Sequence, residues 1–340
     1  MNSKTSHTRL LTATALALAA IGSLLAAACE VEFSPNAEWK DVPVVYCLLD
    51  QDDDTTWVRV ERCFLGEGSI YDFGQIADSI NYPVGSIDVR LLSYRNGTLQ
   101  STESLNVAMR PREDGRFASE PQPIYYTDTR LDEGMMYKLE VLSTADGSTL
   151  ATTDAIQLII NRNSQLVTRP SLHDIFKFLG RYGAEPACEI EWNQLDGARR
   201  YKPMVRFYYG ELGDTHYVDI PCPTVLTGNN VGKLSTICTR SDFLETIRLA
   251  LKDDPNPKEY LKYVDLYITA CDENMSLYLT SVSSGITINQ TTDVYSNIEG
   301  GLGVFAARRT HLHKTIQADS SIVPPNGMQY MLEQLGVGFQ

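Results

Sequence analysis

LDEGMMYKLEV, residues 131–141, is the most informative segment of this 340-residue chain for its fold. Apolar and polar side chains alternate from Tyr137 onwards, which is the period of a strand with one buried face. Asp146-Gly147 follows as a strong turn signal, and residues 150–160 offer a return strand. The segment therefore predicts two neighbouring antiparallel strands in a sheet.

Strand patterns continue upstream of this segment. PVVYCLL (43–49) and the alternating WVRVERCF (57–64) flank a polar loop, which predicts a hairpin. Asn96-Gly97 is a second turn signal. Residues 66–83 have no clear period, apart from a helical turn expected around 72–79. Further strands are expected at 86–94, 98–109 and 124–127.

The spacing L-x-x-G-x-x-Y ending at Tyr137 resembles the tyrosine corner of immunoglobulin-like and fibronectin-type sandwiches. In those folds the tyrosine hydroxyl bonds back to the backbone a few residues upstream. Residues 41–160 are therefore expected to form an immunoglobulin/fibronectin-like β-sandwich.

Residues 161–320 are expected to form a second β-rich, sandwich-like domain with an inserted helix near 241–252, followed by a tail at 321–340. The whole chain is thus predicted to be mainly β. Ser241 is the expected N-cap of that helix, and a short helix is expected at 171–179. The expected strands lie at 188–192, 201–211, 217–220, 263–271 and 276–282.

The first 29 residues have the pattern of an export signal. Lys4 and Arg9 precede an apolar stretch at 10–25, and three alanines lead to Cys29. The end of this pattern resembles a bacterial lipobox, which predicts a signal peptide at 1–28, lipidation of Cys29 and a tether at 29–40. The alternative is ordinary cleavage that leaves Cys29 as a plain thiol.

Charge limits the classes of partner. The net charge is −14, and removing a basic leader makes the remainder more negative. A nucleic-acid partner is not expected, because such proteins need clustered Lys and Arg. Contact with a membrane is expected through the lipid anchor rather than through a basic face.

The chain has seven cysteines and no Cys-x-x-Cys motif, so a structural zinc site is not expected. If Cys29 carries lipid, six remain for an oxidising compartment. Cys222 and Cys238 are the candidate disulfide pair, because both lie in a Pro/Gly-rich loop region. Cys47 and Cys63 lie in strand patterns, where buried free thiols are equally expected.

No catalytic residues are predicted, since no G-x-S-x-G elbow is present. One weak metal candidate exists. Asp50, Asp52, Asp54 and Glu61 stand at positions 1, 3, 5 and 12 of a calcium-loop count, although position 6 is Thr55 instead of glycine. The favoured alternative is a solvated hairpin tip, and no other cofactor is expected.

PVVYCLLD (43–50), VRVERCFLGEG (58–68) and YSNIEGGLGVFAARR (295–309) resemble segments of uncharacterised Bacteroidota envelope lipoproteins that carry a domain of unknown function. The resemblance implies lipid anchoring at the outer membrane, on its periplasmic or cell-surface face. Glu30 and Glu32, just after the cysteine, resemble the surface-export signal of such proteins. The resemblance supplies no catalytic residues.

Two functions remain open from the sequence. The first is a non-catalytic binding or accessory module, with an outer-membrane transporter or surface system as partner. The alternative is a carbohydrate-active or other hydrolase with an unrecognised acidic site. Partner crosslinking and turnover screens distinguish these two functions.

Overall fold

The computed structural model describes residues 42–63, 72, 74–113, 115, 117–171, 174–180, 184–227, 232–254, 256–284 and 294–340. These residues belong to one compact unit, Asp41–Gln340. The unit is mainly β, as predicted, and it contains two hydrophobic cores. Cys29 and the predicted signal and tether lie outside the described residues.

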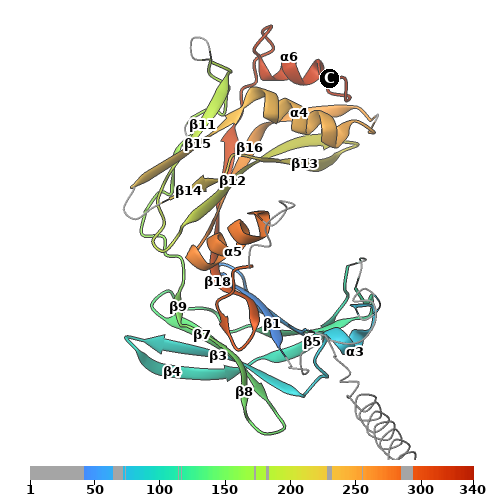
Figure 1. Ribbon diagram of the computed structural model, residues 1–340. Helices are drawn as coiled ribbons and strands as arrows, with labels where there is room; N and C mark the ends of the chain where they lie inside the picture. The colour runs from blue at the N-terminus through green and yellow to red at the C-terminus, as the bar shows by residue number, and fades with distance from the viewer. Residues whose placement is uncertain are drawn as a thin grey trace, which may run out of the picture. The chain divides into compact units, whose positions relative to one another are not determined.

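The first core lies between two sheets (Figure 1). The strand order β1-β2-β6-β5 is that of an immunoglobulin ABED sheet, and β8-β7-β3-β4 corresponds to the GFC sheet with one added edge strand. The bounds of one sheet are β1 Pro43–Leu49, β2 Thr56–Arg62, β6 Gln122–Thr127 and β5 Asn106–Arg110. Those of the other are β3 Ile87–Arg95, β4 Thr98–Ser104, β7 Met136–Ser143, β8 Thr149–Thr153 and the short β9 Ile156–Gln157.

The tyrosine corner is confirmed. The backbone N–H of Asp132 donates a 2.6 Å hydrogen bond to the Tyr137 hydroxyl oxygen, and the Tyr137 side chain is buried. The turn predicted between β3 and β4 is confirmed as well, because Asn96 and Gly97 both have positive φ (50° and 78°). This conformation suits a two-residue hairpin.

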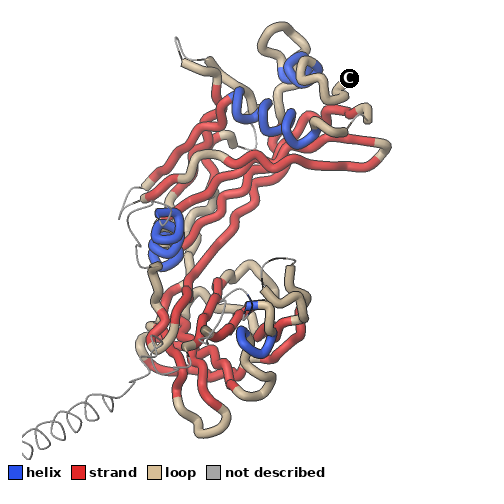
Figure 2. Tube along the Cα trace, turned by 45° about the vertical axis from the view of Figure 1, so that its right-hand side comes forward, coloured by secondary structure: helices blue, strands red, loops and turns tan. Residues whose placement is uncertain are grey.

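The second core lies between a small sheet and a long one. The small sheet has the order β10-β11-β15 (Val167–Arg169, Ala187–Asn193, Lys233–Thr239). Helix α4 (Arg240–Leu251) and the C-terminal segment with α6 (Met328–Glu333) also pack on this core. The long sheet contributes β12 Arg200–Glu211, β13 Asp214–Pro221, β14 Val225–Leu226, β16 Lys258–Cys271 and part of β18 Leu302–Gln317. Strands β12, β16 and β18 run side by side (Figure 2).

Strand β18 belongs to both regions. Its first six residues pair in parallel with β1, from Val44↔Leu302 to Leu49↔Ala307, and its later residues pair antiparallel with β16. The preceding short strand β17 (Ile298–Glu299) pairs with β8. Residues 298–307 therefore complete the sandwich that was predicted to consist of residues 41–160 alone.

The glycines of NIEGGLGVF permit this close approach. Gly303 has a φ of +114°, and a Cβ there would overlap the carbonyl oxygen of Val45 in β1. Asn297 completes the turn, since its amide group hydrogen-bonds both the N–H (2.9 Å) and the C=O (2.7 Å) of Phe305. The motif therefore has a backbone-packing role in this fold.

Three expectations about helices need correction. Residues 276–282 lie in helix α5 (Glu273–Ser284) instead of a strand, because the buried Asp272 caps the helix by accepting from Met275 N (2.9 Å). The described residues of 171–179 are not helical, and Phe176 instead forms a parallel bridge with Ala318. The helix predicted near 241–252 is confirmed as α4, but its N-cap is Thr239 and not Ser241.

Three further segments differ in detail. The strand expected at 98–109 is divided at Leu105 into β4 and β5, which belong to different sheets. The region near 72–79 contains a four-residue helix, α3 (Ala77–Ile80). The tail at 321–340 packs into the second core, since Met328, Leu332 and Phe339 are buried there.

Candidate functional site

A groove of about 680 Å³ lies beside the small sheet. Its apolar lining includes Ile175, Leu179 and Ile237, whose side chains are 47%, 61% and 49% exposed. Ligand sites typically have volumes of about 300–1,000 Å³ and a mainly apolar lining with few polar groups. The groove therefore has the size and the character of a binding site; we call it the aliphatic groove.

The segment before β11 positions two of these side chains. The inward-facing Phe176 is fully buried, its N–H donates to the Gln317 carbonyl (2.7 Å), and its ring contacts Phe178 and Phe243. Because neighbouring side chains alternate in an extended chain, Ile175 and Leu179 face outward. Reciprocal 3.0 and 3.2 Å backbone bonds between Leu179 and Ala187 close this segment onto β11.

Strand β15 supplies the third aliphatic side chain. Its buried and exposed residues alternate, with Leu234, Thr236 and Cys238 facing the core and Ile237 facing outward. In register, Ile237 stands opposite Glu189 of β11. Since β15 is the last strand of its sheet, Ile237 lies on an edge strand.

The rim of the aliphatic groove carries both signs of charge. Arg169 and Glu189 form a 2.8 Å ion pair, and Lys177 adds a second positive group. Glu185 accepts a 2.9 Å hydrogen bond from the N–H of Ser241, and hydrogen bonding by the Ser241 side chain and backbone lowers the pKa of the Glu185 carboxyl. These charges contribute little to stability and lie where a ligand in the groove would meet them.

The thiol of Cys188 lies at the groove and is buried. Burial raises the pKa of Cys188 to about 12, which keeps it as a thiol at neutral pH. A thiol in this form is a poor nucleophile. The aliphatic groove is therefore suited to binding an apolar group rather than to covalent chemistry.

Three of the four calcium-candidate carboxylates contact arginine side chains. Asp50 forms an ion pair with Arg308 (3.1 Å), Asp52 with Arg309 (3.1 Å), and Glu61 with Arg112 (2.8 Å). Asp54 lies in the same loop as Asp50 and Asp52, whereas Glu61 lies near the far end of β2. The four do not converge, and the described residues contain no group of three or more Asp, Glu, His or Cys arranged to hold a metal.

Burial raises the pKa of two carboxyl groups that contact β18, those of Asp50 and Asp272. Desolvation raises the pKa of Asp50, with an opposing contribution from backbone and Arg308 hydrogen bonds. It also raises the pKa of Asp272, whose oxygens accept from Met275 N and Ala307 N. Both carboxylates are occupied in holding β18 and its neighbours, which gives them a structural role.

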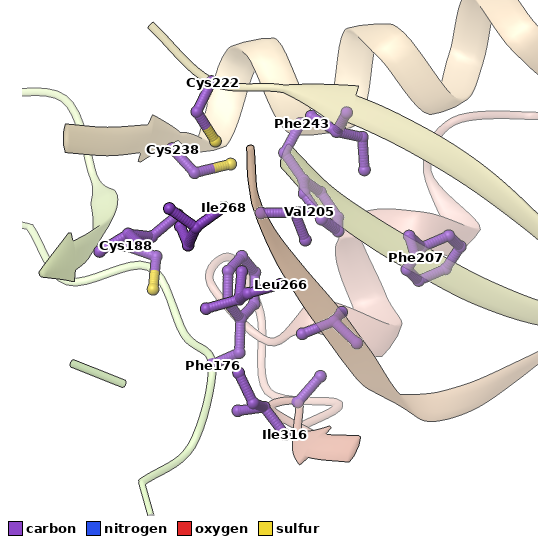
Figure 3. Packing of buried hydrophobic residues seen from close by; sticks show 14 of the residues in the cluster. Phe176, Cys188, Val205, Phe207, Cys222, Cys238, Phe243, Leu266, Ile268 and Ile316 are labelled. Carbon is purple, nitrogen blue, oxygen red and sulfur yellow. The ribbon is translucent and has the colours of Figure 1, made fainter. Parts of the chain in front are cut away.

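The candidate disulfide residues Cys222 and Cys238 lie together in the second core, with Cys188 beside them (Figure 3). All three thiols are buried and free in the structure. Cys188 and Cys238 are also direct partners in the register of β11 and β15.

Sequence reasoning missed the aliphatic groove. The signal was present in DIFKFLG (174–180), where Phe176 and Phe178 alternate with outward residues at a period of two. Reading this segment as a short helix hid the alternation. Ile237 was not distinguishable from any other exposed strand residue.

Neither a protein-family model nor a curated protein sequence matches the chain. Among the helices of the described residues, none has both the length and the apolar character required to cross a membrane.

Proposed function

We propose that this chain is a lipid-anchored lipoprotein of the cell envelope, held at the outer membrane through Cys29, that acts as a non-catalytic binding module for a protein partner. The anchor rests on the leader pattern at 1–28. The binding role rests on one observation, the aliphatic groove with its three exposed side chains. The partner is an outer-membrane transporter or another surface protein.

The chemistry of the aliphatic groove favours a protein segment as its occupant. Three aliphatic side chains suit Leu-, Ile- or Val-type side chains of a partner, and the mixed rim charges suit a peptide that carries both signs. An anionic lipid headgroup would instead require a basic face, and the net charge of −14 opposes this. Ile237 also lies on an edge strand, and edge strands are where extended partner segments add to a sheet.

The binding role is tested by site-specific photocrosslinking in intact cells. A photoreactive residue at Ile237 is expected to give one discrete crosslinked product, and the added substitution Leu179→Glu is expected to abolish it. The matched control is a photoreactive residue at Leu99 of β4, which is equally exposed at 49% but lies in the first sandwich. The same products from both positions, or a product that survives Leu179→Glu, would remove the groove as the docking site.

The anchor is tested separately with Cys29→Ser. We expect the variant to move from the membrane fraction to the soluble envelope fraction, because the acyl chains supply the membrane affinity. Radiolabelled fatty acid should label the wild type and not the variant. Retention of Cys29→Ser in the membrane fraction would refute lipid anchoring without affecting the groove.

A further inference from the structure

Three buried thiols gather in the second core, at the point where the loop after β13 meets the small sheet. Cys222 follows β13, Cys238 lies in β15 and Cys188 lies in β11. Figure 3 shows the sulfur atoms of Cys222 and Cys238 turned toward one another, whereas the sulfur of Cys188 points away from them. The cluster therefore contains one close pair and one additional thiol.

Local hydrogen bonds fix the close pair. The N–H of Cys222 donates to the carbonyl of Pro203 (3.0 Å), which holds the loop against β12. The hydroxyl of Thr236 donates to the carbonyl of Pro223 (3.1 Å), which holds the same loop against β15. Both anchors lie within two residues of a cysteine, so the two sulfur atoms are held near one another by the backbone.

We propose that Cys222 and Cys238 are oxidised to a disulfide when the chain folds in an oxidising compartment, and that Cys188 remains a thiol. The bond would link the loop after β13 to β15, the strand that supplies Ile237 to the aliphatic groove. The inference needs an oxidising environment during folding but is independent of the groove's partner.

The chemistry balances with a disulfide such as oxidised glutathione as the oxidant. One protein thiolate attacks a sulfur of the oxidant, the S–S bond breaks, and one glutathione leaves as a thiolate that takes up a proton. The second protein thiolate then attacks the protein-bound sulfur of the mixed disulfide and releases the second glutathione. The two protein thiols thereby lose two electrons and two protons to the glutathione couple.

The competing pair, Cys188 with Cys238, is less favoured by the geometry. These residues face each other across β11 and β15. However, the sulfur of Cys188 points away from that of Cys238 and is hydrogen-bonded by the backbone of Lys177, in the segment before β11. The sulfur atoms of Cys222 and Cys238 face one another, and Cys238 Sγ also contacts the Thr239 carbonyl at 4.0 Å.

Burial also determines when the bond forms. The pKa of the Cys238 thiol is raised by its hydrogen bond to Cys222 and by desolvation, so few thiolates are present once the core has closed. Thiol–disulfide exchange requires the thiolate and access to it. We therefore expect oxidation during folding to be fast, and oxidation of the folded, reduced protein to be slow.

The test uses the chain refolded from denaturant in a glutathione redox buffer, followed by thiol blocking, proteolysis and mass spectrometry under non-reducing conditions. The expected result is an intact mass lower by two hydrogens and a linked peptide pair containing Cys222 and Cys238. Recovery of both cysteines as blocked thiols, or a linked pair containing Cys188 and Cys238, would overturn the proposal.

Variants provide a second measurement. Cys188→Ser should retain the bond, and so should the control Cys271→Ser, which removes a buried thiol elsewhere in the fold. Cys222→Ser should lose the bond, and reductant should lower the Tm of the wild type by several degrees but leave the Tm of Cys222→Ser unchanged. An equal effect of reductant on both proteins would contradict the proposal even if crosslinking at the groove succeeds.

Discussion

The two cores of the molecule are built from different ranges of sequence. The first core is formed mainly by residues 45–158, which follow one another along the chain, and among the described residues it also receives Ile298 of β17 and Phe305 of β18. The second core gathers the small sheet, the long sheet, α4 and the C-terminal tail, with Ile159 and Phe339 among its members. Local turn and strand signals describe the first core well, whereas the second depends on contacts between distant segments.

The surfaces of the two regions differ as well. At the β1–β2 loop, the carboxylates of Asp50, Asp52 and Asp53 are matched by Arg308 and Arg309. At the aliphatic groove of the second region, exposed apolar side chains line a cavity. The first surface contributes ion pairs to the fold, and the second is where we propose that a partner binds.

The junction between the regions is the most sensitive place to test this comparison. Gly303→Val places a branched side chain at a φ of +114° and against the backbone of Val45. We expect a loss of about 4 kcal/mol or more in the free energy of unfolding, measured in urea, because a backbone neighbour cannot yield.

Gly97→Ala is the matched control for Gly303→Val. Gly97 also has positive φ, but a Cβ there meets nothing within 4 Å. We expect a cost of about 1 kcal/mol from the backbone conformation alone. Equal costs at the two glycines would show that β1 and β18 do not approach as closely as described.

Asp272 tests the link between α5 and β18. Its carboxylate accepts from Met275 N (2.9 Å) and from the buried Ala307 N (3.1 Å), so Asp272→Ala leaves two donors without this partner. We expect a loss of about 3 kcal/mol in the free energy of unfolding. The control Asp253→Ala removes a carboxylate that is 89% exposed and should change stability by about 0.5 kcal/mol or less.

The pH dependence of the Asp272→Ala effect has a defined sign. Burial raises the folded-state pKa of Asp272 above its ordinary value of 3.8. A raised carboxyl pKa contributes stability that is complete below 3.8 and is lost as the pH rises through the folded-state pKa. The stability deficit of the variant should therefore be larger below pH 3.8 than at neutral pH, and a larger deficit at neutral pH would contradict the raised pKa.

Tyr137→Phe removes the corner hydrogen bond of the first sandwich. The N–H of Asp132 then loses the 2.6 Å bond to the hydroxyl, and we expect a cost of about 1.5 kcal/mol in thermal or urea unfolding. Tyr126→Phe is the control, because it keeps the ring contact of Tyr126 with Trp57, whose centroids lie 5.2 Å apart. No difference between the two variants would mean that the corner bond adds nothing to the first core.

Thr239→Ala addresses the smallest effect, at the start of α4 in the second core. The Thr239 hydroxyl accepts from Asp242 N (3.1 Å), and its loss should cost about 1 kcal/mol. Ser241→Ala, at the cap position that the sequence favoured, should cost less, because Ser241 lies inside the helix. A larger loss of stability in Ser241→Ala than in Thr239→Ala would identify Ser241 as the N-cap.

The sequence alone was sufficient wherever a neighbour within a few residues determines the structure. It predicted the mainly β class, the tyrosine corner at Tyr137, the turn at Asn96-Gly97 and helix α4, because turn chemistry and side-chain period are local properties. It failed at 276–282, where the spacing of apolar residues fits a strand as well as a helix. The segment is helical in the structure, and the buried Asp272 caps this helix.

Only the tertiary structure decided what distant segments form together. PVVYCLL and NIEGGLGVF lie some 250 residues apart and pair in parallel. That pairing explains why position 303 is glycine, because a Cβ there would overlap the carbonyl oxygen of Val45. The aliphatic groove and the Cys222–Cys238 pair likewise join residues from separate strands and loops. Such sites depend on distances through space, which local periodicity along the chain does not encode.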